Sequence, residues 1–184
     1  LEEIRKSLPE NFEQKETFIE PFVGSGAVLF WMIANYPNIK TAVINDVNTD
    51  LIITYKAIKN DVSGVVNKLK IWEDEYHQFN ADADARKVYY YDKRTLFNSR
   101  SENEITKAAL FIFLNRTCFN GLYRVNKSNG FNVPIGSYKI PMICDEENLH
   151  SVSDFLQRVE ILNGDFEETL QHVEGQTFFY YDPP

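Results

Sequence analysis

Cysteine, histidine and long apolar runs are all scarce in this sequence of 184 residues. The only two cysteines are Cys118 and Cys144. They are too few for a disulfide framework, and we therefore expect a reducing, intracellular setting. The three histidines are scattered along the chain and predict no metal site. No apolar run approaches the ~20 residues that a membrane-spanning helix needs, so a membrane protein is not expected.

Acidic residues are missing from one internal stretch. The whole chain carries a formal net charge of −8, which argues against a nucleic-acid partner. Between Ile105 and Ile143, however, there is no Asp or Glu. The basic residues of this window are Lys107, Arg116, Arg124, Lys127 and Lys139. The window predicts a local basic surface that the overall charge conceals, with chance clustering of charges as the alternative.

The sequence also lacks the third small residue of the G-x-G-x-x-G dinucleotide fingerprint. A strand-like run, Thr17–Phe22, leads through Gly24-Ser25-Gly26 into a helix-like segment, Ala27–Tyr36. Strand, glycine turn and helix commonly form a cofactor site in an open α/β sheet, since glycines let the backbone approach a ligand closely. Leu29 stands where the third small residue belongs. A nicotinamide or flavin enzyme is therefore disfavoured.

Three further strand-like runs end in polar groups. These are Thr41–Ile44 before Asn45-Asp46, Val159–Leu162 before Asn163-Gly164-Asp165, and Thr177–Tyr181 before Asp182-Pro183-Pro184. In a parallel sheet these strand ends meet at one edge, where ligands bind. Asp46 lies about 20 residues after the glycine turn, as a ribose-binding carboxylate does. The two prolines remove backbone donors and leave an acceptor-only corner at Asp182, suited to an amino group. An Asp taken alone is more often a turn residue or helix cap, and it is the joint placement of these residues at strand ends that favours a functional role.

Helical periodicity separates the second strand-like run from the third. Apolar residues recur at three-and-four spacing over residues 51–58 and 65–76, and the aromatic stretch 86–98 is also helix-like. Ser101 and Glu104 match a capping box that would start the next helix. At this spacing, the aromatic residues are expected in the core rather than as a stacking platform for nucleic acid.

The helical pattern stops between Thr117 and Pro141. Residues 123–125 and 131–133 could pair around Lys127-Ser128-Asn129-Gly130, which predicts a β-hairpin. Long ordered excursions of this kind are more often functional than idle. We therefore expect an α/β core, residues 1–50 and 157–184, interrupted by a mainly helical insertion, residues 51–156. The start at Leu1 and the stop directly after a strand-like run indicate part of a longer protein.

Several of these segments together resemble the Dam-like (D12 class, α-group) site-specific DNA adenine-N6 methyltransferases. The resemblance covers nearly the whole chain, and the block between Phe119 and Pro134 is very specific. The family's fourth motif has a Tyr after Asp-Pro-Pro, and its N-terminal Gly-Gly-Lys segment would precede Leu1; this sequence contains neither. The matching segments are Glu20-Pro21-Phe22-Val23-Gly24-Ser25-Gly26, Asn45-Asp46, Phe119-Asn120-Gly121-Leu122-Tyr123-Arg124-Val125-Asn126, Phe131-Asn132-Val133-Pro134 and Asp182-Pro183-Pro184.

The resemblance implies a Rossmann-like core that transfers a methyl group from S-adenosylmethionine to N6 of adenine in duplex DNA, with no metal. It implies that Asp182, Pro183 and Pro184 are catalytic. It assigns to the cofactor Glu20, Pro21, Phe22, Gly24, Gly26, Asp46, Asp165, Phe166 and Asp182. Asp46 would hold the ribose, and Asp165 would accept from the adenine amino group with Phe166 against the ring.

The same resemblance implies that the 119–134 loop reads DNA, with GATC as the expected site. Phe119 would wedge into the base stack and Asn120 would support the flipped site. Leu122 and Pro134 would touch a thymine methyl, while Arg124 would read a guanine. Arg116, Lys127 and Lys139 would contact phosphates. The expected DNA-binding residues are Arg116, Phe119, Asn120, Leu122, Arg124, Asn126, Lys127, Asn132, Pro134 and Lys139.

Two other functions remain open at this point. One is an N-methyltransferase for RNA or protein, although those relatives lack the Asn-Gly-Leu-Tyr-Arg block. The other is a DNA- or cofactor-binding module without activity. The residues also do not distinguish protection of DNA against a partner restriction endonuclease from regulation of replication or a phage origin.

Overall fold

Four parallel strands form a single sheet in the computed structural model, which describes residues 1–183. The strands are β1 (Thr17–Glu20), β2 (Thr41–Asn45), β3 (Val159–Leu162) and β4 (Thr177–Phe179), in the spatial order β3-β2-β1-β4. The chain therefore adds strands on one side of β1 and then returns to its other side. Ligands of open α/β folds bind where the strand order reverses, here between β1 and β4.

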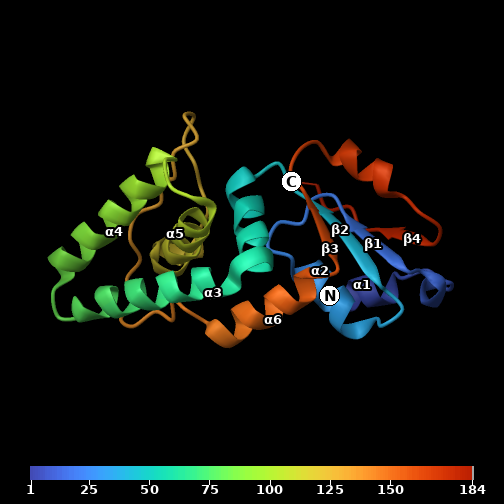
Figure 1. The fold of residues 1–184 in the computed structure, drawn as a ribbon, viewed down its shortest axis with the longest axis horizontal. Coiled ribbons are helices and arrows are strands. Elements are labelled where there is room, and N and C mark those ends of the chain that lie inside the picture. Colours follow the sequence, from blue (N-terminus) through green and yellow to red (C-terminus); the bar gives the residue numbers. More distant parts are fainter. Residues whose placement is uncertain (184) are drawn as a thin grey trace.

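Helices lie on both sides of this sheet in the view of Figure 1. The helices α2 (Ala27–Asn35) and α6 (Glu146–Leu156) lie below the strands, and η3 (Phe166–His172) lies above them. The central strands β1 and β2 are almost entirely buried, as expected of apolar runs in a covered parallel sheet. The short helices α1 (Glu2–Lys6) and η1 (Phe12–Gln14) precede β1.

A helical part extends from the sheet to the left of Figure 1. It contains α3 (Thr49–Gln78), α4 (Ala83–Ser99) and α5 (Glu104–Thr117). The long α3 is broken at Asp61, whose backbone is not helical and whose Oδ1 accepts the Gly64 N–H at 2.9 Å. The two halves correspond to the two apolar faces that the sequence predicts over residues 51–58 and 65–76.

Aromatic side chains hold the helical part together. Tyr76 packs edge-on against Phe113 at 5.5 Å between ring centroids, and Trp72 packs against the same ring at 6.2 Å. Tyr76, Tyr90 and Phe113 are fully buried. The expectation that these aromatics belong to the core is confirmed. The buried cluster runs without interruption from the sheet into these helices.

The segment after α5 folds back as the sequence predicts. After η2 (Phe119–Gly121), Val125 and Phe131 form an antiparallel bridge, and the Asn126 N–H donates to the Gly130 carbonyl at 2.9 Å. We call residues 123–133 the recognition hairpin. The loop containing it rises at the top of the helical part in Figure 1.

Two local expectations need correction. The cap of α5 is Asn103, whose Oδ1 accepts the Thr106 N–H at 2.9 Å, and not Ser101, which the capping-box pattern had placed there. Asn103 is an equally good cap and sits directly before the helix. The helix α6 was not predicted, although Asp145 caps it and Leu149 and Leu156 form its buried face. Over residues 1–183 no helix combines the length and apolarity needed to cross a membrane.

Candidate active site and DNA interface

The carboxyl ends of the four strands meet at one edge of the sheet, as expected. In the parallel register Glu20 pairs with Ile44, Asn45 pairs with Leu162, and Ile19 pairs with Phe179. The side chains after these strands, including Asp46, therefore share this edge. Pro184 lies outside the described residues, so the structure places only Asp182 and Pro183 of the predicted corner.

The glycine turn after β1 forms a tight loop at this edge. Gly24 has a φ of +48° and Gly26 a φ of +74°, both in the left-handed region that side chains disfavour. A Cβ on Gly26 would lie 2.6 Å from the Tyr55 Oη, so the loop is packed on that side. A Cβ on Gly24 would meet no atom within 4 Å, so that side is open. The Tyr55 hydroxyl donates to the Gly24 carbonyl at 3.0 Å.

These two glycines make a matched pair for a stability test. Gly26→Ala is expected to lower the free energy of unfolding by about 2–5 kcal/mol, because the left-handed backbone costs about 1–2 kcal/mol and overpacking about 1–3 kcal/mol. Gly24→Ala is expected to show only the smaller backbone cost. Urea denaturation of both variants measures the difference. Equal losses would show that the Tyr55 contact does not restrict the loop.

Asp46 is held in place by backbone N–H groups, one on each oxygen of its carboxylate. Its Oδ2 accepts the Gly24 N–H at 3.0 Å and its Oδ1 accepts the Asn48 N–H at 2.8 Å. A carboxylate has about four acceptor sites, so about two remain for a ligand. The half-buried side chain is thus held in place while it keeps free acceptor capacity.

Glu20 is the most unusual ionisable group of the edge. It is only 3% exposed, and its Oε2 has no hydrogen-bond partner among the described residues. Burial raises the pKa of Glu20 to about 8, and the nearby Asp182 carboxylate adds to the effect, while the Leu29 N–H opposes it. A buried oxygen without a hydrogen-bond partner costs free energy unless a ligand supplies the missing hydrogen bond or a positive charge. Glu20 is therefore suited to receive a cation or a hydrogen-bond donor.

A residue that sequence reasoning did not assign joins three strand ends. Asn45 is 1% exposed, and its amide donates to the Pro21 and Gly164 carbonyls at 3.2 and 3.1 Å. Its Oδ1 accepts the Gly164 N–H at 3.1 Å. This side chain fixes the spacing between the loops after β1 and β3. Its sequence signals are its position directly before Asp46 and its place in the Asn45-Asp46 segment of the family resemblance.

Aromatic rings also line this edge of the sheet. Phe22 and Phe166 lie 5.5 Å apart between ring centroids, and Phe22 and Tyr181 lie 6.4 Å apart. Phe166 is 39% exposed, so part of its ring is open to a ligand. Asp165 caps η3 through the Glu167 N–H at 2.9 Å, and it is exposed. The Asp182 and Pro183 side chains, also exposed, follow β4 beside these groups.

Apolar residues are exposed in the loop that the sequence assigns to DNA. Phe119 is 50% and Leu122 48% exposed. Asn120 between them has a left-handed backbone, with φ of +54°. Pro134 is exposed, and its carbonyl accepts the Phe119 N–H at 2.9 Å. The loop therefore brings Phe119 and Pro134 together.

The recognition hairpin holds Arg124 in a defined position. Its Nε donates to the Asn132 Oδ1 at 2.7 Å, and one of its two terminal nitrogens donates to the Asn132 carbonyl at 3.5 Å. The Arg124 side chain is nevertheless exposed. Asn126 closes the hairpin, because its Oδ1 accepts the Ser128 and Gly130 N–H groups, both at 2.9 Å. Asn126 and Asn132 therefore have structural contacts of their own, beyond the DNA contacts that the resemblance implies.

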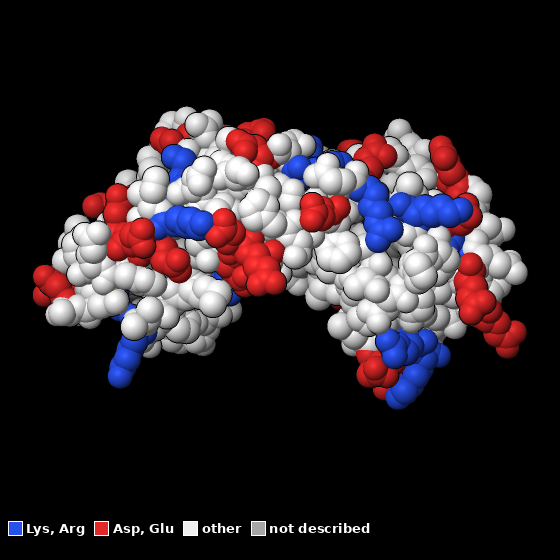
Figure 2. Space-filling view, turned by 60° about the horizontal axis from the view of Figure 1, so that its bottom comes forward, with Lys and Arg blue, Asp and Glu red and all other residues white. Residues whose placement is uncertain are grey.

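The predicted phosphate-binding residues Arg116, Lys127 and Lys139 are all exposed. Arg116 also lines a cavity of about 420 Å³ between α3, α5 and α6 that reaches Ser25 in the glycine turn. On the face shown in Figure 2, acidic and basic side chains alternate, and the surface is hollowed between the two lobes. The basic surface is expected only over residues 105–143, and it stays a prediction. Within residues 1–183 no group of His, Cys, Asp and Glu is arranged to hold a metal ion.

Comparison with known proteins gives one family over the whole chain. The sequence model described as D12 class N6 adenine-specific DNA methyltransferase matches residues 1–184. The Type II methyltransferase M.MjaIII of Methanocaldococcus jannaschii is 45% identical over 188 residues, which cover 100% of this chain and 64% of that protein.

Bacterial and phage proteins are also similar to the chain. The DNA adenine methylase of Haemophilus influenzae is 36% identical over 183 residues, covering 100% of this chain and 58% of that protein. The DNA N-6-adenine-methyltransferase of Escherichia phage P1 is 35% identical over 184 residues, covering 100% of this chain and 22% of that protein. The chain thus spans less than two thirds of the length of these relatives.

Proposed function

The chain belongs to the D12 class of N6 adenine-specific DNA methyltransferases, and from this membership we propose that it methylates N6 of adenine in duplex DNA, within GATC, using S-adenosylmethionine. The observation that carries the proposal is the edge of the sheet, where an acceptor-only corner at Asp182 lies beside the buried, unpartnered Glu20. The DNA adenine methylases among the relatives bear names that agree with it.

The residues of this edge fit S-adenosylmethionine, which supplies an electrophilic methyl group when bound. Glu20 offers a buried unpartnered oxygen to the cationic methionine end. The open space around Gly24 lets the backbone approach a ligand closely. The ring pair Phe22 and Phe166 offers an apolar surface to an adenine. The cationic end and the adenine of the cofactor therefore each have a matching group.

The remaining residues of this edge hold and orient the ribose and the adenine of the cofactor. Asp46, with about two free acceptor sites, receives the ribose hydroxyls. Asp165 has its Oδ1 on the cap of η3 and offers its second oxygen to an adenine amino group. Pro21 and Gly26 shape the turn on either side of Gly24. These roles leave Asp182 free to face the DNA base.

We assign the chemical step to the corner after β4. The amino nitrogen of adenine is a poor nucleophile, because its lone pair is delocalised into the ring. The Asp182 carboxylate and the Pro183 carbonyl accept its two N–H bonds, which favours a pyramidal nitrogen with its lone pair available. This is positioning combined with electrostatic stabilisation of the positive charge that develops on nitrogen. Pro183 and Pro184 carry no N–H, so neither residue adds a backbone donor to the chain after Asp182.

The duplex hides this nitrogen, so the target adenine must be flipped out of the stack at a cost of a few kcal/mol. We propose that Phe119, which is 50% exposed, wedges into the vacated space and that Leu122, which is 48% exposed, contacts a thymine methyl. Asn120 supports the flipped site, and Pro134 contacts a thymine methyl. We therefore propose residues 51–156 as the target-recognition part of the chain and residues 1–50 and 157–184 as the catalytic core.

Transfer of labelled methyl groups from S-adenosylmethionine to DNA tests this proposal. The full-length protein is expected to label the adenine of a GATC duplex and to label poorly a duplex in which the guanine–cytosine pair is inverted. Equal labelling of both duplexes would contradict the GATC assignment. Label on RNA or on a protein, with none on DNA, would contradict the DNA substrate.

Arg124→Ala is expected to relax the guanine preference by roughly 5- to 150-fold, since a bidentate arginine–guanine pair contributes about 1–3 kcal/mol of discrimination. The ratio of kcat/KM for the GATC duplex and the inverted duplex measures the change. Lys127→Ala, in the same hairpin, is the matched control. It is expected to weaken binding to both duplexes equally and to reduce the slope of log K against log salt concentration by about one. An unchanged ratio for Arg124→Ala would contradict the role of Arg124 in base reading.

A further inference from the structure

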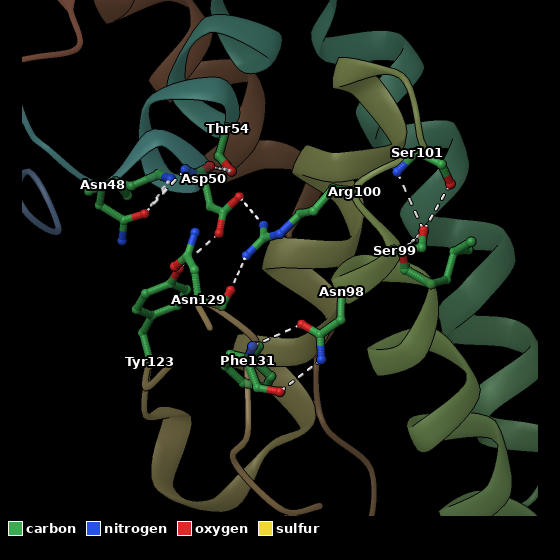
Figure 3. A network of polar contacts seen from close by, with 12 residues as sticks. Asn48, Asp50, Thr54, Asn98, Ser99, Arg100, Ser101, Tyr123, Asn129 and Phe131 are labelled. Carbon is green, nitrogen blue, oxygen red and sulfur yellow. Dashed lines mark hydrogen bonds and ion pairs between the residues drawn. The ribbon is translucent and has the colours of Figure 1, made fainter. Parts of the chain in front are cut away.

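A buried carboxylate links the recognition hairpin to the cofactor edge of the sheet. Asp50, in the first turn of α3, is 9% exposed. Its Oδ2 accepts the Tyr123 hydroxyl of the hairpin at 2.9 Å, and its Oδ1 is paired with the Arg100 guanidinium after α4. Arg100 also donates to the Asn129 carbonyl at the hairpin tip, at 2.7 Å. Figure 3 shows these groups converging on Asp50 from three elements.

The same short segment carries Asp46, to which we have assigned the ribose. Asn48 connects the two aspartates, since its N–H donates to the Asp46 Oδ1 at 2.8 Å and its side chain accepts the Asp50 N–H at 3.1 Å. Asp46 in turn holds the Gly24 N–H of the glycine turn at 3.0 Å. Hydrogen bonds therefore run from the glycine turn through residues 46–50 into the recognition hairpin.

Apolar packing does not fill the space between this segment and the hairpin. A cavity of about 250 Å³ lies there, lined by Val47, Asn48, Thr49, Asp50, Tyr123, Val125 and Asn129. The polar contacts of Asp50 bridge the two sides of the cavity. On its far side the Tyr123 ring packs against Phe111 and Phe131, at 5.3 and 5.9 Å between centroids. Asn98 ties the hairpin to α4 through the Phe131 N–H and carbonyl, at 2.8 and 3.0 Å, whereas the contacts of Asp50 tie it to the segment that carries Asp46.

A buried carboxylate is stable only when it is paired and hydrogen-bonded, so Asp50 must find both partners in the folded chain. Moving the hairpin away from residues 46–50 would separate Asp50 from Tyr123. Conversely, a ligand that fixes Asp46 also fixes the segment that presents Asp50. The two sites therefore bias the same contacts, which is the physical requirement for coupling between them.

We propose that Asp50, Arg100 and Tyr123 are positioning residues that couple occupancy of the cofactor edge to the placement of the recognition hairpin on DNA. This inference rests on the proposed function, because it takes the ligands of the two sites to be the cofactor and duplex DNA. Arg124 follows Tyr123 directly, so the contact that holds Tyr123 also holds the guanine-reading side chain. Each ligand is then expected to tighten binding of the other by the same factor.

The test measures binding linkage in the full-length protein and needs no turnover. The Kd of S-adenosylhomocysteine is measured with and without saturating GATC duplex, and the Kd of the duplex with and without S-adenosylhomocysteine. Wild type is expected to show a coupling factor of about 5- to 150-fold, equal in both directions. Tyr123→Phe keeps the ring but removes the hydroxyl. It is expected to reduce the factor toward one while the Kd of S-adenosylhomocysteine alone stays within about twofold.

Tyr89→Phe is the matched control, because the Tyr89 hydroxyl also donates to a carboxylate, that of Glu75, and both residues lie on helices outside the hairpin. Tyr89→Phe is expected to keep the full coupling factor. If a general loss of stability were enough to reduce coupling, this variant would reduce the factor as well. Asp50→Asn should reduce the factor as Tyr123→Phe does. Wild-type coupling in Tyr123→Phe would overturn the positioning role. Linked binding without methyl transfer by wild type would instead support this inference and contradict the proposed function.

Discussion

Asp182→Ala is expected to lower kcat for methyl transfer to a GATC duplex by roughly 100- to 1,000-fold, the effect typical of removing one preorganised electrostatic contact to a transition state. The reason is positional, because Asp182 accepts an N–H of the target amino group and stabilises the positive charge that develops there. Single-turnover kinetics with preformed complexes measure this step apart from product release.

Asp165→Ala provides the comparison for this result, since Asp165 is also an exposed aspartate in the segment that follows a strand of the sheet. We have placed Asp165 against the adenine of the cofactor, away from the reacting nitrogen. Its loss is expected to raise KM for S-adenosylmethionine while kcat changes much less. If Asp182→Ala instead raised only KM and left kcat intact, Asp182 would be a binding residue and the proposed chemistry would be wrong.

The second large effect concerns Glu20 and pH. In the free protein, burial raises the pKa of Glu20 to about 8, so the carboxyl is mostly neutral below that pH. A cationic ligand favours the carboxylate, and binding below pH 8 must therefore release a proton. The affinity for S-adenosylmethionine is then expected to rise with pH, by up to about tenfold per pH unit, until Glu20 is already ionised in the free protein. Above about pH 8 it falls again, because a free α-amino group loses its proton near pH 7.7–8.0.

Isothermal titration calorimetry in buffers with different ionisation enthalpies counts the released protons. At neutral pH the count is expected to be close to one for wild type and zero for Glu20→Gln. The glutamine variant should also bind roughly 10- to 150-fold more weakly near pH 8, since a hydrogen bond to a charged group contributes about 1.5–3 kcal/mol. Glu160→Gln, which alters an exposed carboxylate on β3, is expected to keep the proton release. Unchanged release in Glu20→Gln would contradict the role of Glu20.

The sheet and its edge could be predicted because their signals are local. Apolar runs at residues 17–22, 41–44 and 159–162 mark buried strands, and the parallel order places the groups that follow them together. The ends of three of the four predicted strands differ by one or two residues, since β1 ends at Glu20, β2 at Asn45 and β4 at Phe179. The helix α6 was missed because its amphipathic pattern directly follows a long irregular loop.

The environment of the site residues could not be predicted in the same way. Nothing in the sequence around Glu20 indicates that one of its oxygens is buried without a partner, because that depends on the packing of α2 and on Asp182 after β4. The pairing of Asp50 with Tyr123 and Arg100 joins residues 50 to 73 positions apart. Such contacts follow from the tertiary fold and leave no periodic signal.

The central claim is that the edge around Asp182 transfers a methyl group to N6 of adenine. The most direct measurement is nucleoside analysis by mass spectrometry of a GATC duplex treated with the full-length protein and isotope-labelled S-adenosylmethionine. The account predicts labelled N6-methyladenine as the product, and its loss in Asp182→Ala. Label on cytosine, or the same yield of N6-methyladenine from Asp182→Ala as from wild type, would contradict it.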